Sequence, residues 1–376
     1  MRTVMFMAIA GAIFLPFNFV AIRSLLHLHP RRRGWIVAAA ILGNLMWPFF
    51  PLLRTTGAFF RLVRALLGPM WFAWTSFAIL YTAMIVIAGL LWAVARTAKP
   101  VPFERIARWP SRLFMIVTFI AVPIGVYQAL VPLRVERVQV FVANLPAQAE
   151  GTRIALLSDL HVGLFTRPSR LTRIFATTRA LDPHAAVILG DLIDDDPHFV
   201  PKLLAGTSAL GPAIPLLAVL GNHEMYGEPE RVIAAMRGSR IRLLVNENVE
   251  LRSLKLVGLS DPAAMQMQER RALAPDLARA MSGNSGFPII LSHQPKIFEE
   301  AVRQGLPLTL AAHTHGGQCG VRSFRWSLAG LFLKYHMGLY REAASQLFIT
   351  TGTGYWLVPF RLGMTPEIVV IELRRR

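Results

Sequence analysis

The stretch RIALLSDLHVG, residues 153–163, places Asp159 and His161 two positions apart at the end of a short apolar run. Side chains at positions i and i+2 of an extended segment point to the same face, so both would project together from the tip of a strand. Ligands of α/β proteins bind at such strand ends. A turn with a solvated histidine explains this fragment equally well, so the two interpretations are separated by the rest of the sequence.

Several later apolar runs of the chain end in the same way. The residues that follow these runs are Asp191, Asn222, His223, His293, His313 and His315. The alternation of short apolar runs with helical patterns after residue 134 indicates stacked sheets covered by helices. Five of the ten histidines stand at strand ends, which packing alone explains poorly. Imidazole together with carboxylate and amide oxygens is a ligand set for Mn, Fe or Zn.

The chemistry of these residues predicts a dinuclear metal site. Two ions about 3.5–4 Å apart can bind both oxygens of a phosphoryl group and lower the pKa of a bridging water. Gly190 and Gly221 stand directly before predicted ligands, where the backbone has to turn tightly.

The first third of the chain consists mainly of long uncharged segments. Residues 4–22, 34–53, 65–95 and 113–133 each reach the roughly 20 apolar residues that a helix needs to span a bilayer. We therefore expect a membrane domain at residues 1–133 with about four transmembrane helices, or three, followed by a second domain at 134–376. A signal peptide is the other interpretation of the first segment, but basic residues follow it rather than a small-residue cleavage site.

Charge is distributed unevenly between these two parts. Residues 1–133 hold one acidic side chain and thirteen Lys or Arg, whereas the remaining 243 residues hold 27 basic and 21 acidic side chains. Segments 23–33 and 96–112 carry nine basic residues, and the opposite side carries six. The positive-inside rule then predicts a multi-pass protein of the inner (cell) membrane with its C-terminal domain on the outer, periplasmic face.

Much of the net charge of +18 comes from residues 1–133, where basic residues stand beside apolar segments. Basic residues in such positions face anionic lipid headgroups. The sequence contains no zinc-finger or other DNA-reading motif, so the expected partner is a lipid bilayer and no nucleic acid. Cys319 is the only cysteine, which excludes an intrachain disulfide and a thiolate metal site.

The motif order D-x-H, GD-x-x-D, GNHE, H and H-x-H resembles the calcineurin-like metallophosphoesterase superfamily, over roughly residues 150–376. The closing stretch GTGYWLVPFRLGMTPEIVVIEL, residues 352–373, is similar to its membrane-anchored bacterial branch. The resemblance implies an N-terminal α-helical transmembrane bundle followed by an α/β domain, a four-layer αββα sandwich. It also implies a hydrolase of phosphoester or pyrophosphate bonds with two divalent metal ions, Mn first and Fe or Zn as alternatives.

The same resemblance assigns a role to each strand-end residue. One carboxylate would bridge the two ions because it has two oxygens to share. The ligands of the first ion would be Asp159, His161 and His315. Those of the second ion would be Asn222, His293 and His313, and Asp191 would bind both ions.

The catalytic residues implied by the resemblance are His223 and Asp194. His223 would donate to the scissile phosphate or protonate the leaving oxygen, and Asp194 would orient it. Asp195 and Asp196 are expected to be solvated loop residues. The sequence departs from the family at Ala312, where a glycine usually precedes the H-x-H pair.

Two regions bear on the substrate. Residues 326–344 are apolar and aromatic with interspersed basic residues, which predicts either a packed amphipathic helix or a lid that receives an acyl chain or dips into the membrane. Lys334 in this segment and Arg361 near the Pro-x-Arg turn are the candidate substrate-binding residues. A structural role is the alternative for Arg361.

The predicted reaction is in-line attack by a hydroxide bridging the two metals, on a membrane lipid or nucleotide-lipid such as UDP-2,3-diacylglucosamine or a phospholipid. Relatives in the superfamily cleave that nucleotide-lipid in lipid A assembly, on the cytoplasmic side, which conflicts with the charge count. A broad-specificity phosphodiesterase or phosphatase acting on soluble substrates is the alternative. A non-catalytic membrane receptor on this fold should have lost metal ligands, whereas every ligand position is filled here. A transporter should carry ionisable residues in its spans, whereas the four predicted spans contain none.

Overall fold

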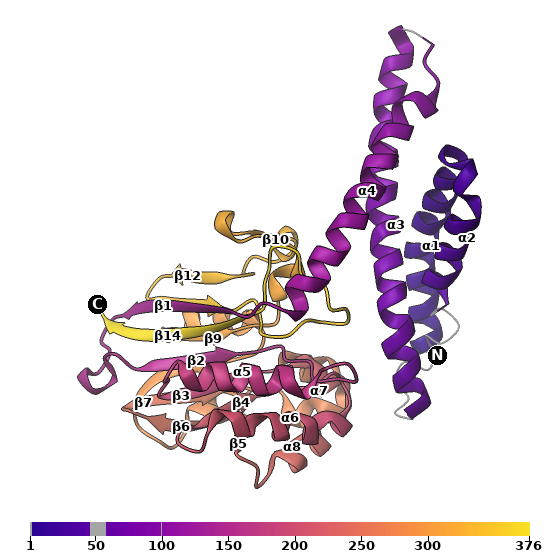
Figure 1. Ribbon diagram of the computed structural model, residues 1–376. Helices are drawn as coiled ribbons and strands as arrows, with labels where there is room; N and C mark the ends of the chain where they lie inside the picture. The colour runs from indigo at the N-terminus through magenta and orange to yellow at the C-terminus, as the bar shows by residue number, and fades with distance from the viewer. Residues whose placement is uncertain (1, 46–57, 99) are drawn as a thin grey trace. The chain divides into compact units, whose positions relative to one another are not determined.

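The computed structural model of the chain describes residues 2–45, 58–98 and 100–376 (Figure 1). By its internal contacts the chain divides into two compact units, Met1–Ile124 and Gly125–Arg376. Helix α4 crosses this division, so its last turn belongs to the second unit.

The first unit is helical in the described residues apart from short connections at His29, Leu45 and 100–102. Its helices are α1 (Arg2–Leu28), α2 (Arg33–Asn44), α3 (Ala58–Ala98) and the greater part of α4 (Phe103–Leu130). Two segments in the described part of the chain are long and apolar enough to cross a membrane, Leu66–Thr97 and Phe103–Leu130. They correspond to the third and fourth predicted spans.

The first and second predicted spans are matched by neither of these two segments. Residues 4–22 lie within α1, where Ile13–Leu28 forms a shorter apolar stretch. The span predicted at 34–53 begins in α2 and continues into positions outside the described residues. The basic segment 96–112, which connects the third and fourth predicted spans, is mostly helical, since α3 continues to Ala98 and α4 begins at Phe103.

The second unit contains two six-stranded mixed sheets. In the first sheet β2, β3, β4 and β5 are parallel, β14 is antiparallel to β2, and β1 pairs with β14 in parallel. The strands in spatial order are β1 (Arg134–Val142), β14 (Glu367–Arg375), β2 (Arg153–Leu157), β3 (Ala185–Leu189), β4 (Leu216–Val219) and β5 (Ile241–Leu243).

The second sheet has a similar parallel centre. Strands β7, β8, β9 and β13 are parallel, and the edge strands β6 and β12 are antiparallel to their neighbours. The strands in spatial order are β12 (Gly338–Glu342), β13 (Ser345–Ile349), β9 (Leu308–Ala311), β8 (Phe287–Leu291), β7 (Leu254–Gly258) and β6 (Glu247–Leu251).

The two faces of the first sheet contribute to different parts of the core. In β2, Ile154 and Leu156 pack in one cluster with side chains of the second sheet, including Leu256 and Ile289. The alternate residues Ala155 and Leu157 pack in another cluster with helix side chains. This period of two follows from the pleat of a strand, and every side chain of β2 after the first is apolar because both faces are covered.

Short helices accompany the sheets of this unit. Figure 1 shows α5 and α6 beside β2, β3 and β4, and α5 contributes buried side chains to the same cluster as Ala155. These helices are α5 (Pro168–Ala180), α6 (Val200–Thr207), α7 (Asn222–Tyr226), α8 (Pro229–Met236), α9 (Leu277–Met281) and α10 (Phe298–Arg303).

The helix predicted within 326–344 is wrong. The segment contains β11 (Trp326–Ser327), paired with β10 (Gly320–Val321), then a single 3-10 turn at Ala329–Leu331, and then β12. Most of its large apolar side chains are exposed, so no buried apolar stripe is present to stabilise an α-helix.

Candidate metal centre

The predicted ligands lie at the carboxyl ends of parallel strands of both sheets. Asp159 follows β2, Asp191 follows β3 and Asn222 follows β4, while His293 and His313 follow β8 and β9 of the second sheet. Every residue predicted as a ligand comes to this end of the domain. The ligands do not lie on extended strands, however: β2 ends at Leu157, and Asp159 and His161 have positive φ values of 50° and 43°.

Four side chains form the first group. Nε2 of His315 lies 3.2 Å from Nε2 of His161 and 3.4 Å from Oδ1 of Asp159. Nε2 of His161 lies 3.5 Å from Oδ2 of Asp191. The four ligand atoms all lie within 4.8 Å of one another, which is close enough to hold one metal ion.

A second group shares Asp191 with the first. Nε2 of His293 lies 3.0 Å from Nδ1 of His313, 3.0 Å from Oδ1 of Asn222 and 3.2 Å from Oδ2 of Asp191. One oxygen of Asp191 therefore faces both groups. The other oxygen, Oδ1, accepts the backbone N–H of His223 at 3.0 Å, so Oδ2 is the oxygen that would be available to both ligand groups.

The protein atoms alone leave this cluster incompletely satisfied, which fits a metal. Oδ1 of Asp159 is fully buried and accepts no hydrogen bond from the described residues. A buried carboxylate oxygen without a partner costs roughly 1–3 kcal/mol or more, and a divalent cation would remove that cost. Buried imidazole, carboxylate and amide donors match the preferences of Mn, Fe and Zn.

Electrostatics within the cluster give its members different protonation states. Burial lowers the pKa of His293, but Asp191 outweighs burial and raises it to about 10, so a metal would have to displace a proton there. Burial raises the pKa of Asp191, but His293 and His223 outweigh burial and bring the pKa well below its usual range, so the carboxylate is ionised. Burial lowers the pKa of His313 to about 3, and burial with the nearby Arg361 lowers the pKa of His315. These imidazoles are therefore neutral, which is the form that binds a metal.

His223 lies beside the metal ligands, and two carboxylates lie near its Nδ1, with Asp195 closer than the predicted Asp194. Its Nδ1 is 2.6 Å from Asp195 but 3.8 Å from Asp194. Burial lowers the pKa of His223, yet the carboxylates of Asp191, Asp195 and Asp194 outweigh burial and raise it to about 10. The positive φ of Asp195, 58°, turns its side chain toward the histidine.

Asp196 is also not a solvated loop residue. It is buried, and its carboxylate caps the 3-10 turn Pro197–Phe199 by accepting the N–H of His198 at 2.9 Å. Sequence reasoning could have found this role from the D-P pair, which is a common start of a helical turn.

The glycines before the ligands are required by close approach. A Cβ at Gly190 would lie 2.7 Å from the His293 side chain, and a Cβ at Gly221 would overlap the carboxylate and backbone of Asp191. Ala312 needs no glycine, because its φ is not positive and its methyl group is buried among apolar side chains between the sheets. The departure from the family pattern therefore leaves the ligand positions intact.

Glu224 is a structural member of the site that sequence reasoning missed. Its carboxylate accepts backbone N–H groups of Asp191, Leu192, Ile193 and Gly221 at 2.7–3.2 Å. Burial and the charge of Asp191 raise the pKa of Glu224 to about 7. The signal for this role was present, because Glu224 closes the GNHE motif three residues after the helix N-cap.

The two candidate substrate-binding residues lie in different environments. Arg361 is fully buried, and its guanidinium donates to Nδ1 of His315 at 3.1 Å and to the carbonyl of Thr351 at 2.7 Å. These contacts correspond to a structural role for Arg361, the alternative to substrate binding that the sequence left open. Lys334 is exposed and pairs with Glu342 at 2.7 Å, and it contacts no metal-ligand side chain in the described structure.

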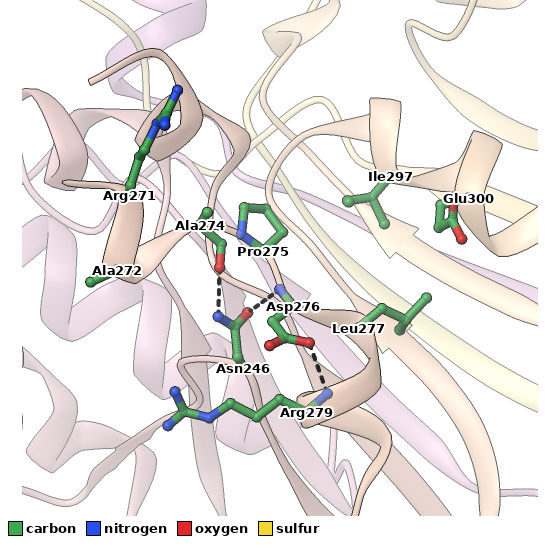
Figure 2. Close-up of a pocket in the computed structure, with 10 residues that line it drawn as sticks. All are labelled: Asn246, Arg271, Ala272, Ala274, Pro275, Asp276, Leu277, Arg279, Ile297 and Glu300. Carbon is green, nitrogen blue, oxygen red and sulfur yellow. Dashed lines mark hydrogen bonds between the residues drawn. The ribbon is translucent and has the colours of Figure 1, made fainter. Parts of the chain in front are cut away.

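A hollow of about 470 Å³ elsewhere in the domain contains none of the predicted ligands (Figure 2). Its polar groups satisfy one another: Asn246 bonds the carbonyl of Ala274 and the N–H of Asp276, and Asp276 caps α9 by accepting the N–H of Arg279. This pattern is typical of loop stabilisation, so the metal cluster stays the candidate site.

Comparisons with known proteins agree with the geometry. Residues 152–317 match the family model described as calcineurin-like phosphoesterase. A Danio rerio protein called transmembrane protein with metallophosphoesterase domain is 29% identical over 337 residues, covering 82% of this chain and 75% of the relative. An uncharacterised metallophosphoesterase of Helicobacter pylori is 27% identical over 338 residues, covering 87% and 89%.

Two further comparisons cover less of the molecule. An uncharacterised metallophosphoesterase of Campylobacter jejuni is 30% identical over 235 residues, and the alignment covers 61% of each chain. A sulfate thiohydrolase structure from Thermus thermophilus overlaps 62% of this chain and 58% of its own, with 13% identity and a TM-score of 0.37. The shared-ligand cluster and the family match together show that this chain carries a calcineurin-like metallophosphoesterase domain, the catalytic domain of a phosphoester hydrolase.

Proposed function

We propose that the chain is a membrane-bound, metal-dependent hydrolase that cleaves a phosphoester or pyrophosphate bond in a lipid-linked substrate. The observation that carries the hydrolytic part is the pair of buried ligand groups that share Oδ2 of Asp191. A pair of divalent ions, when bound, supplies a water of lowered pKa and neutralises charge on the phosphoryl oxygens. The four-layer αββα arrangement and the transmembrane bundle belong to the same proposal.

The protein's own residues supply orientation and a proton. Asp191 and Asp159 carry the negative charge of the site, whereas Asn222 offers an amide oxygen and adds none, so the loaded site stays electropositive toward a phosphate. His223 is buried beside the ligands and, with Asp195 at 2.6 Å, holds a proton for the leaving oxygen. Glu224 fixes the backbone that carries both Asp191 and His223.

Exposed aromatic side chains in the segments that carry the ligands support a lipid-linked substrate. Phe165 follows His161 by four positions and is 55% exposed. The ring of Tyr226 is 52% exposed and lies 5.8 Å from the ring of His223. Exposed aromatic groups close to a polar reaction centre fit a substrate with an apolar part, such as UDP-2,3-diacylglucosamine or a phospholipid.

The first test is hydrolysis by the purified full-length protein with Mn²⁺, on bis(p-nitrophenyl) phosphate and on UDP-2,3-diacylglucosamine. Asp191→Asn should abolish turnover of either substrate, whereas Asp182→Asn should not, because Asp182 is an exposed partner of Arg153. Preference for the lipid would support the lipid-linked substrate. Preference for the soluble diester would favour the broad-specificity alternative, and turnover that survives Asp191→Asn would overturn the proposed site.

The charge count supports a multi-pass inner-membrane protein with its catalytic domain outside the cytoplasm. A phosphatase reporter fused to the C-terminus, active only outside the cytoplasm, should therefore be active. An inactive fusion with an active cytoplasmic reporter at the same position would reverse the orientation and make a cytoplasmic nucleotide-lipid accessible to the site.

A further inference from the structure

We propose that residues 321–334, here called the aromatic loop, form a second membrane contact that inserts into an anionic lipid surface beside the end of helix α4. This contact is independent of which phosphoester the enzyme cleaves. It would attach the catalytic domain to the bilayer at a point other than the chain connection to α4.

The aromatic loop exposes an unusual number of large apolar side chains. Phe324 is 82% exposed, Phe332 is 81% exposed and Leu331 is 60% exposed. Four more apolar residues of the same loop are exposed: Val321, Trp326, Leu328 and Leu333. Single exposed apolar residues are ordinary, but a cluster of this kind marks an interaction surface or a membrane contact.

The charge of the loop selects a lipid surface. No acidic residue occurs between Gly320 and Arg341, and Arg325 and Lys334 stand among the exposed apolar side chains, with Lys334 paired to Glu342 just beyond this stretch. Aromatic and aliphatic side chains flanked by Lys and Arg are typical of segments that lie in the interface of an anionic bilayer.

Side-chain contacts hold the base of the loop against β12, while its large apolar side chains stay exposed. Ser327 is buried and its hydroxyl lies 2.9 Å from Nδ1 of His336. Arg325 donates to the carbonyl of Leu339 at 3.1 Å and lies over the ring of Tyr340. These contacts are local to the loop and β12, and they leave Phe324 and Phe332 pointing away from the core.

Hydrogen bonds connect the base of this loop to the last turn of α4. The side-chain oxygen of Gln128 accepts the N–H of Gly363 at 2.8 Å. The neighbouring carbonyl of Leu362 accepts the N–H of Gly320, and the carbonyl of Cys319 accepts the N–H of Leu328. All these residues belong to the second compact unit. The aromatic loop is thus attached to the terminus of Phe103–Leu130, a segment long and apolar enough to cross a membrane.

Site-directed spin labelling of the full-length protein tests this contact. In a Cys319→Ser background, Phe332→Cys and the control Ser285→Cys would each carry one nitroxide, in vesicles of phosphatidylethanolamine and phosphatidylglycerol. Ser285 is exposed in the turn before β8, and the metal ligands follow the opposite end of that strand. Unchanged thermal unfolding of both unlabelled variants would show that each is folded.

The expected result is a label at 332 that is several-fold more accessible to oxygen than to a water-soluble nickel chelate, with the reverse at 285. Equal accessibility ratios at both positions would overturn the proposal. Shielding at 332 from both reagents, with spin–spin broadening, would overturn it in favour of contact with a second copy of the chain. Vesicles of phosphatidylcholine alone should give a shallower label, and an unchanged depth would refute the role of Arg325 and Lys334.

Discussion

At the scale of single residues, the backbone conformation of the ligands is as specific as their chemistry. Five ligand residues adopt positive φ values between 43° and 73°: Asp159, His161, Asp191, His313 and His315. Asp and His are among the residues that tolerate this region best, yet strained positions cost of order 1–3 kcal/mol each. Such strain persists only where surrounding contacts fix the backbone, as the four N–H groups bound to Glu224 do around Asp191.

Asp195→Asn is expected to change the pH dependence of hydrolysis more than Asp194→Asn. His223 must carry its proton to assist the leaving oxygen, so activity falls as pH rises through the pKa of His223. That pKa is raised to about 10 by carboxylates that outweigh burial, and bound metal ions would take up the charge of Asp191. Loss of the contact at 2.6 Å should therefore move the alkaline limb to lower pH. kcat–pH profiles would measure this shift. A larger shift for Asp194→Asn would show that Asp194, the residue predicted from the sequence, is the main partner of His223.

Gly221→Ala is expected to reduce activity by at least a hundredfold while the domain stays folded. The new methyl group would overlap Oδ1 and the backbone N of Asp191 and so shift the carboxylate whose Oδ2 faces both ligand groups, and small displacements at a reaction centre cost about this factor. Gly89→Ala is the control, because Gly89, like Gly221, has no positive φ and has nothing within 4 Å of an added Cβ. Equal losses of activity in the two variants would mean that the loss does not come from a displaced ligand.

At the scale of elements, the loops after the strands and the end of α4 determine how the ligands are held. The backbone N–H of Arg361 donates to the carbonyl of Gly125 in α4 at 3.0 Å, while its guanidinium donates to His315. Phe360 packs directly against Gly125. One loop therefore contacts both the last turn of α4 and a predicted metal ligand, which neither segment reveals by its own sequence pattern.

Arg361→Gln should strengthen metal binding by about tenfold, because a guanidinium that donates to Nδ1 keeps the proton of neutral His315 on Nε2, the atom that faces the other ligands. The guanidinium is buried and holds the ring of His315 through Nδ1. Competition for Mn²⁺ against a fluorescent chelator would measure the affinity, with Arg341→Gln as a control outside the site. Unchanged affinity with a raised KM would mean that Arg361 contacts the substrate.

At the scale of the whole molecule, the candidate site joins the two sheets. The first ligand group takes Asp159, His161 and Asp191 from loops of the first sheet and His315 from the second. The second group combines Asp191 with His293 and His313 of the second sheet. A bound metal ion would therefore connect the two halves of the catalytic domain, in addition to the apolar contacts between the sheets.

Removal of metal should lower the thermal stability of the catalytic domain as well as abolish activity. A ligand present at 100 times its Kd stabilises the folded state by about 2.7 kcal/mol, and each kcal/mol shifts Tm by about 2–4 °C in a domain of this size. Scanning calorimetry with and without a chelator, followed by return of Mn²⁺, would measure the shift. Asp191→Asn should show no such shift, and an equal shift in this variant would place the stabilising metal elsewhere.

Much of the architecture could be predicted from the sequence because strand patterns are local. The apolar runs at 153–157, 185–189 and 308–311 are β2, β3 and β9, and the polar residues after them lie at one end of the domain. Period and composition were sufficient there, since a strand buried on both faces reads as a continuous apolar run. They failed at 326–344, where apolar side chains face solvent instead of a core.

The sequence by itself determined which residue types reach the site, because the order of motifs along the chain fixes which strand ends carry Asp, Asn and His. Only the tertiary structure decided which atoms meet. It placed Asp195 closer to His223 than Asp194, presented one oxygen of Asp191 to both ligand groups, and buried Arg361 beside His315. These outcomes depend on loop conformations and on contacts between residues distant in the chain, which no local periodicity encodes.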